Sequence, residues 1–283
     1  MRRLTLLLSL LVIATTTLLA NKPLDLKVMT FNIRYATHHD GENSWDNRKE
    51  AVMKLLKSES CDLIGTQEVL HNQFEDIANT LPQYNAVGVG REDGKTKGEY
   101  AAIYYLKERF DELESGNFWL SETPEKIGVK GWDAACERVA TWVRLQERET
   151  KREFLFINTH LDHMGQMARK KGIELVLERA HLYAKGNPII LTGDLNASPH
   201  SEVIKYVTEG ENKLYDSRYM AEVMEGTSWS FHDFDRAPIE RRQLIDYIFI
   251  TKPLRVKSHS VLPMRLDGQL VSDHNPIVAE ITL

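Results

Sequence analysis

The sequence contains only two cysteines, Cys61 and Cys136, among its 283 residues. So few cysteines exclude a disulfide framework as the basis of the fold. Cys61 begins an apolar, strand-like run, and we expect it to be a buried free thiol. The chain also lacks a Pro/Gly/Ser linker, a low-complexity tract and an internal repeat, so we expect one compact domain.

No apolar run is long enough for an unambiguous membrane-spanning helix, which needs about 20 apolar residues. The most apolar stretch, Leu6 to Ala14, follows two arginines and is succeeded by threonines and small residues up to Asn21. This pattern is typical of a signal peptide, which we place at residues 1–20 in preference to a retained anchor. We therefore expect an exported, periplasmic or extracellular protein whose domain is 21–283.

The chain has no excess of positive charge. Its formal net charge is -5 at pH 7, and removal of the two N-terminal arginines makes it more negative still. Such a balance argues against tight binding of long nucleic acid through the whole surface, because that affinity comes mainly from neutralising phosphates. It is compatible with an enzyme that meets its substrate at one metal-filled cleft. Nothing indicates an obligate protein partner, and we expect a monomer.

Secondary structure follows from the spacing of apolar residues. Alternation and β-branched residues predict strands at 26–33, 62–67, 84–89, 100–106, 118–120, 139–145, 154–159, 188–192, 244–251, 255–262 and 276–282. Helical spacing predicts helices at 46–57, capped by Asp46, at 71–81, at 164–184, and from Pro199 onward. Many strands with helices between them predict an α/β sandwich of two packed sheets with helices outside.

Polar residues stand at the ends of six predicted strands, where a simple fold does not need them. These segments read TFNIR, TQE, NTHLDH, GDLN, IDYIF and SDHNP. Polar groups at strand ends converge at one rim of a sheet, where a pocket can form. Each is weak alone, since Asp194 could be a turn residue and Glu68 could cap the next helix. Asp246 is more unusual, because a buried carboxylate needs a partner, and a neighbouring strand could bring His274 to it.

The order of these six segments resembles that of the endonuclease/exonuclease/phosphatase family. The likeness runs from Leu26 to the C-terminus, and GDLN and SDHNP are its most specific pieces. The resemblance implies a four-layered α-β-β-α sandwich with two mainly antiparallel sheets and a site at one edge of both. Phosphate-ester hydrolysis with Mg²⁺, for which Mn²⁺ could substitute, is the implied chemistry.

The resemblance also assigns roles to residues. It implies that Glu68 is the principal Mg²⁺ ligand, with Asn32 and Asp273 nearby, and oxygen donors of this kind suit a hard ion. The implied catalytic residues are Asp194 for the attacking water, Asn196 for the phosphate oxygens, His160 for the phosphate or leaving oxygen, and His274 held by Asp246. Which histidine is the acid and which contacts the phosphate stays open at this point.

Three further side chains are candidates for substrate binding. Arg138 resembles an arginine that reaches the substrate phosphate, although a surface ion pair is the alternative. Arg34 lies just beyond Asn32 and could assist, or it could form a surface salt bridge. Trp132 could flank the cleft and stack on a base or sugar, but large aromatics more often simply pack.

These features favour a phosphodiesterase or nuclease-type activity, exonuclease-like (3'-5') or endonuclease-like. The alternatives are a phosphomonoesterase acting on a sugar or lipid phosphate, and a non-catalytic carbohydrate- or phosphate-binding module on the same fold. The partner in every case is a phosphate ester: nucleic acid, nucleotide, sugar phosphate or phospholipid head group. NTHL and the segment 47–49 look most like nocturnin-type deadenylases, but a signal peptide argues against a deadenylase role inside the cell.

Overall fold

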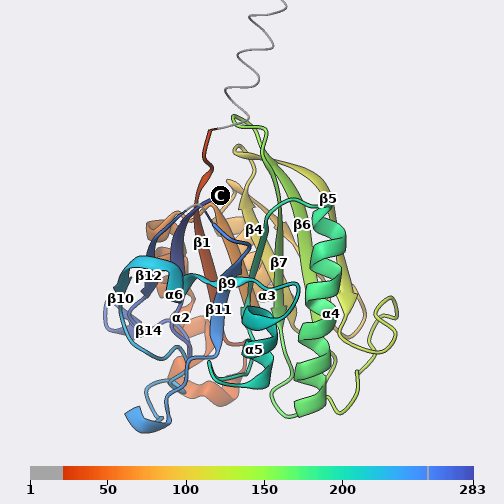
Figure 1. The fold of residues 1–283 in the computed structure, drawn as a ribbon. Coiled ribbons are helices and arrows are strands. Elements are labelled where there is room, and N and C mark those ends of the chain that lie inside the picture. Colours follow the sequence, from red (N-terminus) through yellow and green to blue (C-terminus); the bar gives the residue numbers. More distant parts are fainter. Residues whose placement is uncertain (1–21, 254) are drawn as a thin grey trace, which may run out of the picture.

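The computed structural model describes residues 22–253 and 255–283 (Figure 1). The predicted signal peptide, residues 1–20, lies outside the described residues, and it stays a prediction. Within these two described ranges, no helix combines the length and the apolar character needed to cross a membrane.

The first of two large sheets has seven strands and is mixed, with mainly antiparallel pairs. Its order is β10 (Ala221–Glu225), β12 (Arg255–Val261), β15 (Ile277–Thr282), β1 (Asp25–Asn32), β2 (Leu63–Val69), β4 (Tyr100–Leu106) and β3 (Tyr84–Val87). The parallel pairs are β1–β2 and β10–β12.

The second sheet has six strands and faces the first. Its order is β5 (Phe110–Trp119), β6 (Val139–Glu147), β7 (Glu153–His160), β8 (Ile189–Asp194), β11 (Asp246–Ile250) and β9 (Tyr215–Asp216). Here β7 and β8 are the parallel pair. A separate two-stranded ribbon joins β13 (Arg265–Leu266) and β14 (Gln269–Leu270).

Helices cover the outer faces of both sheets. On the first sheet they are α2 (Trp45–Glu59) and α3 (His71–Thr80), whose apolar residues share one core cluster with β1, β2 and β4. On the second sheet they are α4 (Gln166–Ala184), the long helix in Figure 1, and α5 (Glu202–Glu209). Short segments are η1 (His38–Asn43), α6 (Ser217–Met220) and η2 (Ile239–Arg241). The predicted four-layered sandwich is confirmed.

The period of two in β1 explains how a polar side chain reaches the space between the sheets. Leu26 and Val28 belong to the core between the two sheets, whereas Met29 and Phe31 belong to the core beneath the helices. Alternate side chains of a strand point to opposite faces. Continuing the alternation, Asn32 falls on the inter-sheet side at the end of the strand, where it is fully buried.

Strand ends meet at one edge of the sandwich. The parallel strands β1 and β2 end there, as do β7 and β8, while the antiparallel strand β11 begins there. The register places His160 beside Asp194, and Asp194 beside Asp246. The predicted convergence at one rim therefore follows directly from the pairing of the strands.

Below that edge, a buried polar layer joins the two sheets. Gln67 Nε2 donates to Asn158 Oδ1 at 2.7 Å, and Thr192 Oγ1 donates to the same oxygen at 3.0 Å. Asn158 Nδ2 donates back to the main-chain oxygen of Thr66 at 2.8 Å. A Cβ atom at Gly65 would lie 2.2 Å from Thr192 Oγ1, so only glycine fits here. This network fixes the sheets relative to each other directly beneath the cleft, although Gln67 Oε1 has no hydrogen-bond partner among the described residues.

Several predicted boundaries were wrong. The strand predicted at 118–120 is the end of the longer β5, whose exposed acidic residues hid its first half. The last predicted helix starts at Glu202 and not at Pro199, because the Ser201 hydroxyl caps it by accepting from the Ile204 N–H. Ser44, not Asp46, stands at the N-cap of α2. The short elements β9, α6 and β10 were not predicted.

Candidate active site

A cleft of about 600 Å³ opens at the edge where the strand ends meet. Eight predicted site residues line it: Arg34, Glu68, Arg138, His160, Asp194, Asn196, Asp273 and His274. Two more, Asn32 and Asp246, stand directly behind it and hydrogen bond to residues of its wall. Trp132 is not among the lining residues; its main-chain N–H faces the carboxylate of Glu122 instead. The fold thus brings together ten of the eleven side chains.

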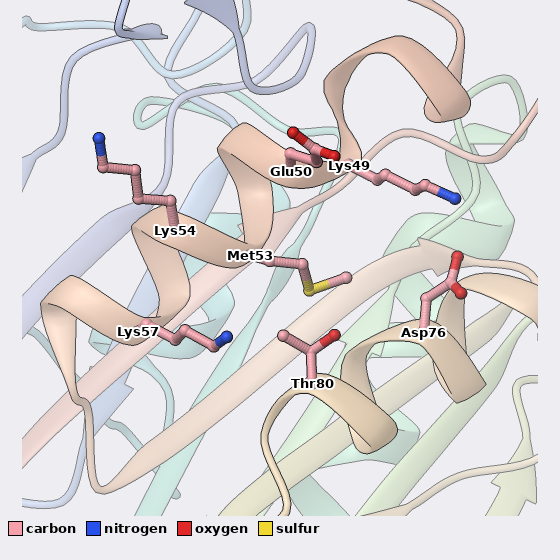
Figure 2. A pocket seen from close by; sticks show the side chains of 7 residues that line it. All are labelled: Lys49, Glu50, Met53, Lys54, Lys57, Asp76 and Thr80. Atoms are coloured by element: carbon pink, nitrogen blue, oxygen red, sulfur yellow. The ribbon is translucent and has the colours of Figure 1, made fainter.

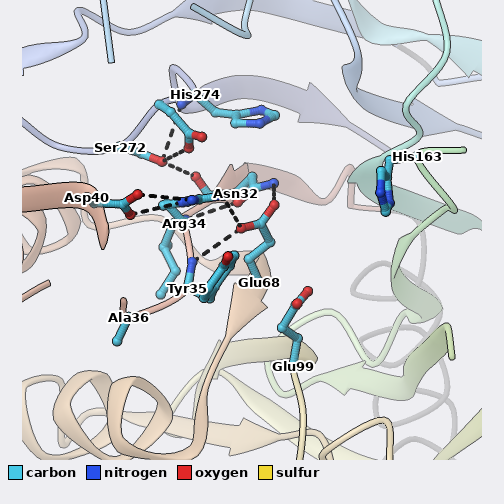
Figure 3. A network of polar contacts seen from close by, with 12 residues as sticks. Asn32, Arg34, Tyr35, Ala36, Asp40, Glu68, Glu99, His163, Ser272 and His274 are labelled. Carbon is cyan, nitrogen blue, oxygen red and sulfur yellow. Dashed lines mark hydrogen bonds and ion pairs between the residues drawn. The ribbon is translucent and has the colours of Figure 1, made fainter. Parts of the chain in front are cut away.

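One side of the cleft is rich in oxygen atoms. Asn32 Nδ2 donates to Glu68 Oε1 at 3.1 Å and to Asp194 Oδ2 at 3.0 Å, and so holds the two carboxylates together (Figure 3). The Asn32 oxygen accepts from the Arg34 N–H at 3.0 Å. Metal binding through Asn32 would therefore use the second lone pair of this oxygen or a rotated amide.

Asp273 adds a third carboxylate to this side. Ser272 Oγ lies 3.2 Å from Asp273 Oδ1. The same hydroxyl donates to the main-chain oxygen of Asn32 at 2.7 Å (Figure 3), which ties this loop to the end of β1. Burial and the charge of Glu68 raise the pKa of Asp273, although the nearby His274 opposes the shift. Burial and mutual repulsion oppose full ionisation of such a cluster of carboxylates. A hard divalent cation would stabilise their ionised forms.

Asp194 is fully buried at the centre of the site. Burial, followed by the charge of Asp246, raises its pKa to about 7. Ligand atoms of Asp194, Asp246 and His274 lie within 4.8 Å of one another, a spacing that could also hold a metal ion. The main-chain N–H of Asn196 donates to Asp194 Oδ1 at 2.9 Å and fixes the carboxylate.

The predicted pairing of His274 with Asp246 is confirmed, with 2.8 Å between Nδ1 and Oδ2. The two residues are not on adjacent strands as expected. Asp246 begins β11 of the second sheet, while His274 precedes β15 of the first, so the pair bridges the two sheets. Burial lowers the pKa of His274, but Asp246, together with the charges of Asp194 and Asp273, outweighs burial and raises the pKa to about 10. The other ring nitrogen, Nε2, lies 3.7 Å from Asp194 Oδ2.

His160 has the opposite electrostatic environment. Burial, then the positive charges of Arg138 and Arg91, lower its pKa well below the usual value. Its Nε2 accepts from the Asn196 side-chain amide at 3.0 Å, which leaves the proton of the neutral ring on Nδ1. That Nδ1 is buried and has no partner in the described part of the chain.

Arg138 is buried and is not a surface ion pair. Its side chain is 5% exposed; Nε lies 3.4 Å from Asp162 Oδ2 and Nη2 lies 3.0 Å from His163 Nδ1. Nη1 is buried without a hydrogen-bond partner among the described residues. A buried donor without an acceptor is costly, so this nitrogen is suited to receive an anionic ligand.

Three residues of the site have left-handed backbone conformations. The φ angles of Arg34, Glu68 and Asn196 are 57°, 57° and 47°. At Glu68 the pairing of β2 with β4 also shifts register, as at a β-bulge. A non-glycine residue in this region costs roughly 1–2 kcal/mol, and such strain concentrates at functional sites. Here it redirects side chains that regular strands would place elsewhere.

Two residues that line the cleft had no signal in the sequence motifs, and a third residue, Arg48, lies behind the cleft. Arg91 and Glu99 line the cleft from a loop between β3 and β4 that carries no strand-end motif. Arg48 is fully buried behind the oxygen-rich side, and it donates to the main-chain oxygens of Ile33 and Val271 at 2.5 and 3.0 Å. Burial lowers its pKa to about 10. Arg48 thereby joins the two segments that carry Asn32 and Asp273, and only its helical position near the N-terminus of α2 hinted at this.

Two other features do not build an active site. Ligand atoms of Cys136, Asp162 and His163 lie within 4.8 Å, but Asp162 already accepts from the main-chain N–H groups of Ala135, Met164 and Gly165. A hollow of about 500 Å³ between α2 and α3 is lined by the buried Met53 and by exposed or half-buried side chains, among them three lysines (Figure 2). It holds no buried ionisable cluster, unlike the cleft at the sheet edge.

The sequence also matches known proteins. Residues 29–274 match the model described as the Endonuclease/Exonuclease/phosphatase family. A crystal structure of an endonuclease/exonuclease/phosphatase from Bacteroides vulgatus is similar with a TM-score of 0.88 and 40% identity, over 91% of this chain and 98% of that one. The structure of a mannosyl-6-phosphatase from Bacteroides thetaiotaomicron has a TM-score of 0.84 and 34% identity, over 91% and 100%.

A more distant relative is nocturnin of Homo sapiens, which is 24% identical over 297 aligned residues. The alignment covers 91% of this chain but only 65% of nocturnin. The chain therefore spans a little less than two thirds of the length of that protein.

Proposed function

This chain belongs to the endonuclease/exonuclease/phosphatase family and is a phosphoester hydrolase, and from this premise we propose that it is a metal-dependent phosphomonoesterase acting on a sugar phosphate. One observation carries the proposal: the same small cleft has an oxygen-rich side with Glu68, Asp194 and Asp273, and a cationic side where the buried Nη1 of Arg138 has no hydrogen-bond partner among the described residues. The first side suits a divalent cation and the second suits a phosphoryl group.

The position of Arg138 favours a monoester over the diester that the sequence favoured. Its unpaired Nη1 is buried, so a phosphate must enter the cleft deeply to reach it. A terminal phosphoryl group can do so, whereas a diester must leave the cleft in two directions. The net charge of -5 also gives a nucleic-acid backbone little attraction outside the cleft. Similarity to a mannosyl-6-phosphatase supports a sugar as the alcohol part of the ester.

The residues present support hydrolysis by in-line attack of water. The water oxygen bonds to phosphorus while the bond from phosphorus to the ester oxygen breaks. Asp194, fixed by Asn196 and Asn32, is placed to orient the water and take its proton. The leaving oxygen requires a proton, for which His160 and His274 are the candidates on the cleft wall.

We propose Mg²⁺ as the cofactor, with Glu68, Asp273 and Asn32 as the residues that would hold it. Carboxylate and amide oxygens are the donors that Mg²⁺ prefers, and three buried or half-buried acids need positive charge nearby. When bound, the ion would neutralise charge that develops on the phosphate. Mn²⁺ should replace it, because Mn²⁺ accepts the same ligands.

A substrate panel with purified protein tests the proposed function. Rates with Mg²⁺ are measured for mannose 6-phosphate, for p-nitrophenyl phosphate, for bis(p-nitrophenyl) phosphate and for a single-stranded oligonucleotide. We expect kcat/KM for the two monoesters to exceed that for both diesters. Higher kcat/KM for either diester would refute the assignment as a monoesterase and restore the nuclease-type alternative.

We also propose that the protein is exported and that residues 1–20 are removed. The motivation is the arginine pair followed by a short apolar stretch. N-terminal sequencing of protein recovered from its native host should give a start near Asn21. Recovery of the intact Met1 terminus from the soluble cytoplasmic fraction would contradict export.

A further inference from the structure

The loop between β3 and β4 presents an ion pair to the cleft that the catalytic chemistry does not use. Arg91 Nη1 donates to Glu99 Oε2 at 2.7 Å, and both side chains are less than one-fifth exposed. Both line the same cleft as Arg138 and Asp194. Figure 3 shows the Glu99 carboxylate pointing toward the space between Glu68 and His163. The pair therefore stands beside the position where the phosphate ester would lie.

The loop holds this pair rigidly. The main-chain N–H of Arg91 donates to the main-chain oxygen of Glu99 at 3.1 Å, so the two residues face each other across the loop. The indole N–H of Trp119 donates to the main-chain oxygen of Arg91 at 2.6 Å and anchors the loop to β5. Because these contacts exist without ligand, the two side chains are preorganised for binding and need little ordering when a ligand arrives.

Hydrogen-bonding capacity remains on both partners. Arg91 uses Nη1 for the ion pair, while its buried Nε has no partner within the described ranges. Glu99 uses Oε2, and Oε1 makes no hydrogen bond to any described residue. The ion pair thus keeps one donor nitrogen and one acceptor oxygen without a partner among the described residues. Each hydroxyl group of a sugar both donates and accepts, so adjacent hydroxyls match this arrangement.

The charge of the pair distinguishes a hydroxyl site from a second phosphate site. The carboxylate paired with Arg91, Glu99, lines the cleft itself, whereas Asp162, the partner of Arg138, is not among the residues that line it. A second phosphate would have to overcome the Glu99 carboxylate, because like charges repel in a cleft of low dielectric. Neutral, polyhydroxylated groups meet no such barrier.

We propose that Arg91 and Glu99 bind hydroxyl groups of the sugar part of the substrate, and so select polyhydroxylated phosphate esters. This proposal rests on the proposed phosphomonoesterase function and names the residues that recognise the alcohol part of its substrate. In this proposal Arg91 and Glu99 contact the sugar and not the phosphate. A substrate without hydroxyl groups should therefore be hydrolysed equally well whether or not the pair is present.

The test compares substrates with and without hydroxyls in the Glu99→Gln variant. Loss of a charged hydrogen-bond partner costs about 1.5–3 kcal/mol, so kcat/KM for mannose 6-phosphate should fall roughly 10- to 100-fold. For p-nitrophenyl phosphate, kcat/KM should change less than about threefold. Glu99→Asp, which keeps the charge but shortens the side chain, should give an intermediate loss. Glu92→Gln, an exposed acid in the same loop, is the matched control and should match wild type for both substrates.

Hexose 6-phosphates that each lack one hydroxyl sharpen the test. With the wild-type enzyme, at least one of these deoxy sugar phosphates should have a lower kcat/KM than the parent hexose 6-phosphate. With the Glu99→Gln variant, removal of the same hydroxyl should cause no further decrease in kcat/KM. Equal losses for sugar and aryl substrates, or no loss for either, overturn the proposal. A wild-type protein that prefers diesters is a different result, because it refutes the monoesterase function before any variant is compared.

Discussion

The two walls of the cleft have opposite chemical character. The acidic wall contains the carboxylates of Glu68, Asp194 and Asp273, and the Asn32 amide donates to the first two. The basic wall, made of Arg138 and His160, places a guanidinium group beside a neutral imidazole. The three carboxylates outnumber the cations beside them, Arg34, with Nη1 3.8 Å from Glu68 Oε2, and His274, with Nε2 3.7 Å from Asp194 Oδ2. The basic wall keeps two donors, Arg138 Nη1 and His160 Nδ1, that have no acceptor among the described residues.

This difference indicates that each wall is completed by a different ligand. Buried groups of one sign are expensive unless they are paired, so each wall favours a ligand of the opposite charge. A divalent cation would satisfy the acidic wall, and a phosphoryl group would satisfy both the cation and the basic wall. Changes in the acidic wall should therefore alter metal binding, and changes in the basic wall should alter substrate binding alone.

The largest effect should come from the acidic wall. Glu68→Gln replaces the proposed metal ligand with a side chain of the same size. Metal affinity should therefore fall sharply. Turnover should fall by about 10³-fold or more, because the positions of both the metal and the phosphate depend on Glu68. Calorimetric titration with Mg²⁺ and steady-state rates measure this. Chelation should abolish wild-type activity, and Mg²⁺ or Mn²⁺ should restore it.

Glu75→Gln, at an exposed acid on α3, serves as the control for Glu68→Gln and should behave as wild type. If Glu68→Gln binds Mg²⁺ as tightly as wild type, Glu68 is not the principal ligand. Full activity in excess chelator would contradict metal dependence altogether.

The next effect concerns the pair that bridges the two sheets between the walls. Asp246→Asn and His274→Ala should each lower turnover by about 10²–10³, the usual result of losing one preorganised electrostatic contact. Because the 2.8 Å hydrogen bond makes the two residues one unit, the double variant should be little worse than either single variant. Losses that multiply in the double variant would show that the residues act independently.

A smaller effect is expected from the basic wall. Arg138→Met removes the unpaired donor but keeps a long apolar stem, so KM for a monoester should rise about 10- to 100-fold, as for a lost charged hydrogen bond. Affinity for Mg²⁺ should not change. Arg148→Met, in a half-exposed ion pair with Asp111, is the control. A parallel loss of metal affinity in Arg138→Met would mean that the two walls are not separate.

The smallest effect is on folding stability, and it concerns a buried histidine that takes no part in catalysis. His259 lies outside the cleft on β12; burial lowers its pKa to about 4, and its Nδ1 contacts Ser217 Oγ at 2.9 Å. The unfolded chain binds a proton near pH 6.5, so the stabilising contribution of neutral His259 is complete above that pH. It is lost as pH falls toward 4, by about 1.4 kcal/mol for each pH unit.

Denaturant unfolding of wild type and His259→Gln between pH 7 and pH 4 measures this contribution. Burial raises the pKa of the neighbouring Asp216 to about 6, which gives a contribution of opposite sign, but this cancels in the difference between the two proteins. We expect the difference in unfolding free energy to shrink as pH falls. A difference that is independent of pH would show that His259 is not held neutral.

The sequence predicted strand ends well because their signal is local. Asp194 follows Gly193 at the end of an apolar run, and His160 ends another, so composition alone marks both positions. The charged first half of β5 was missed because an edge strand with an exposed face need not alternate clearly. Arg91 and Glu99 were missed because their loop has no periodicity, and only folding brings it to the cleft.

The amino-acid sequence by itself determined the family, the sandwich of two sheets, and ten side chains of the candidate site, because each depends on residue type and order along the strands. Tertiary structure alone decided that Asp246 and His274 meet across two sheets, that Arg138 is buried with one nitrogen lacking a partner among the described residues, and that His160 and His274 have opposite pKa shifts. These properties depend on distances and burial between segments far apart in the chain. Electrostatic energies vary steeply with both, and neither is encoded in local spacing.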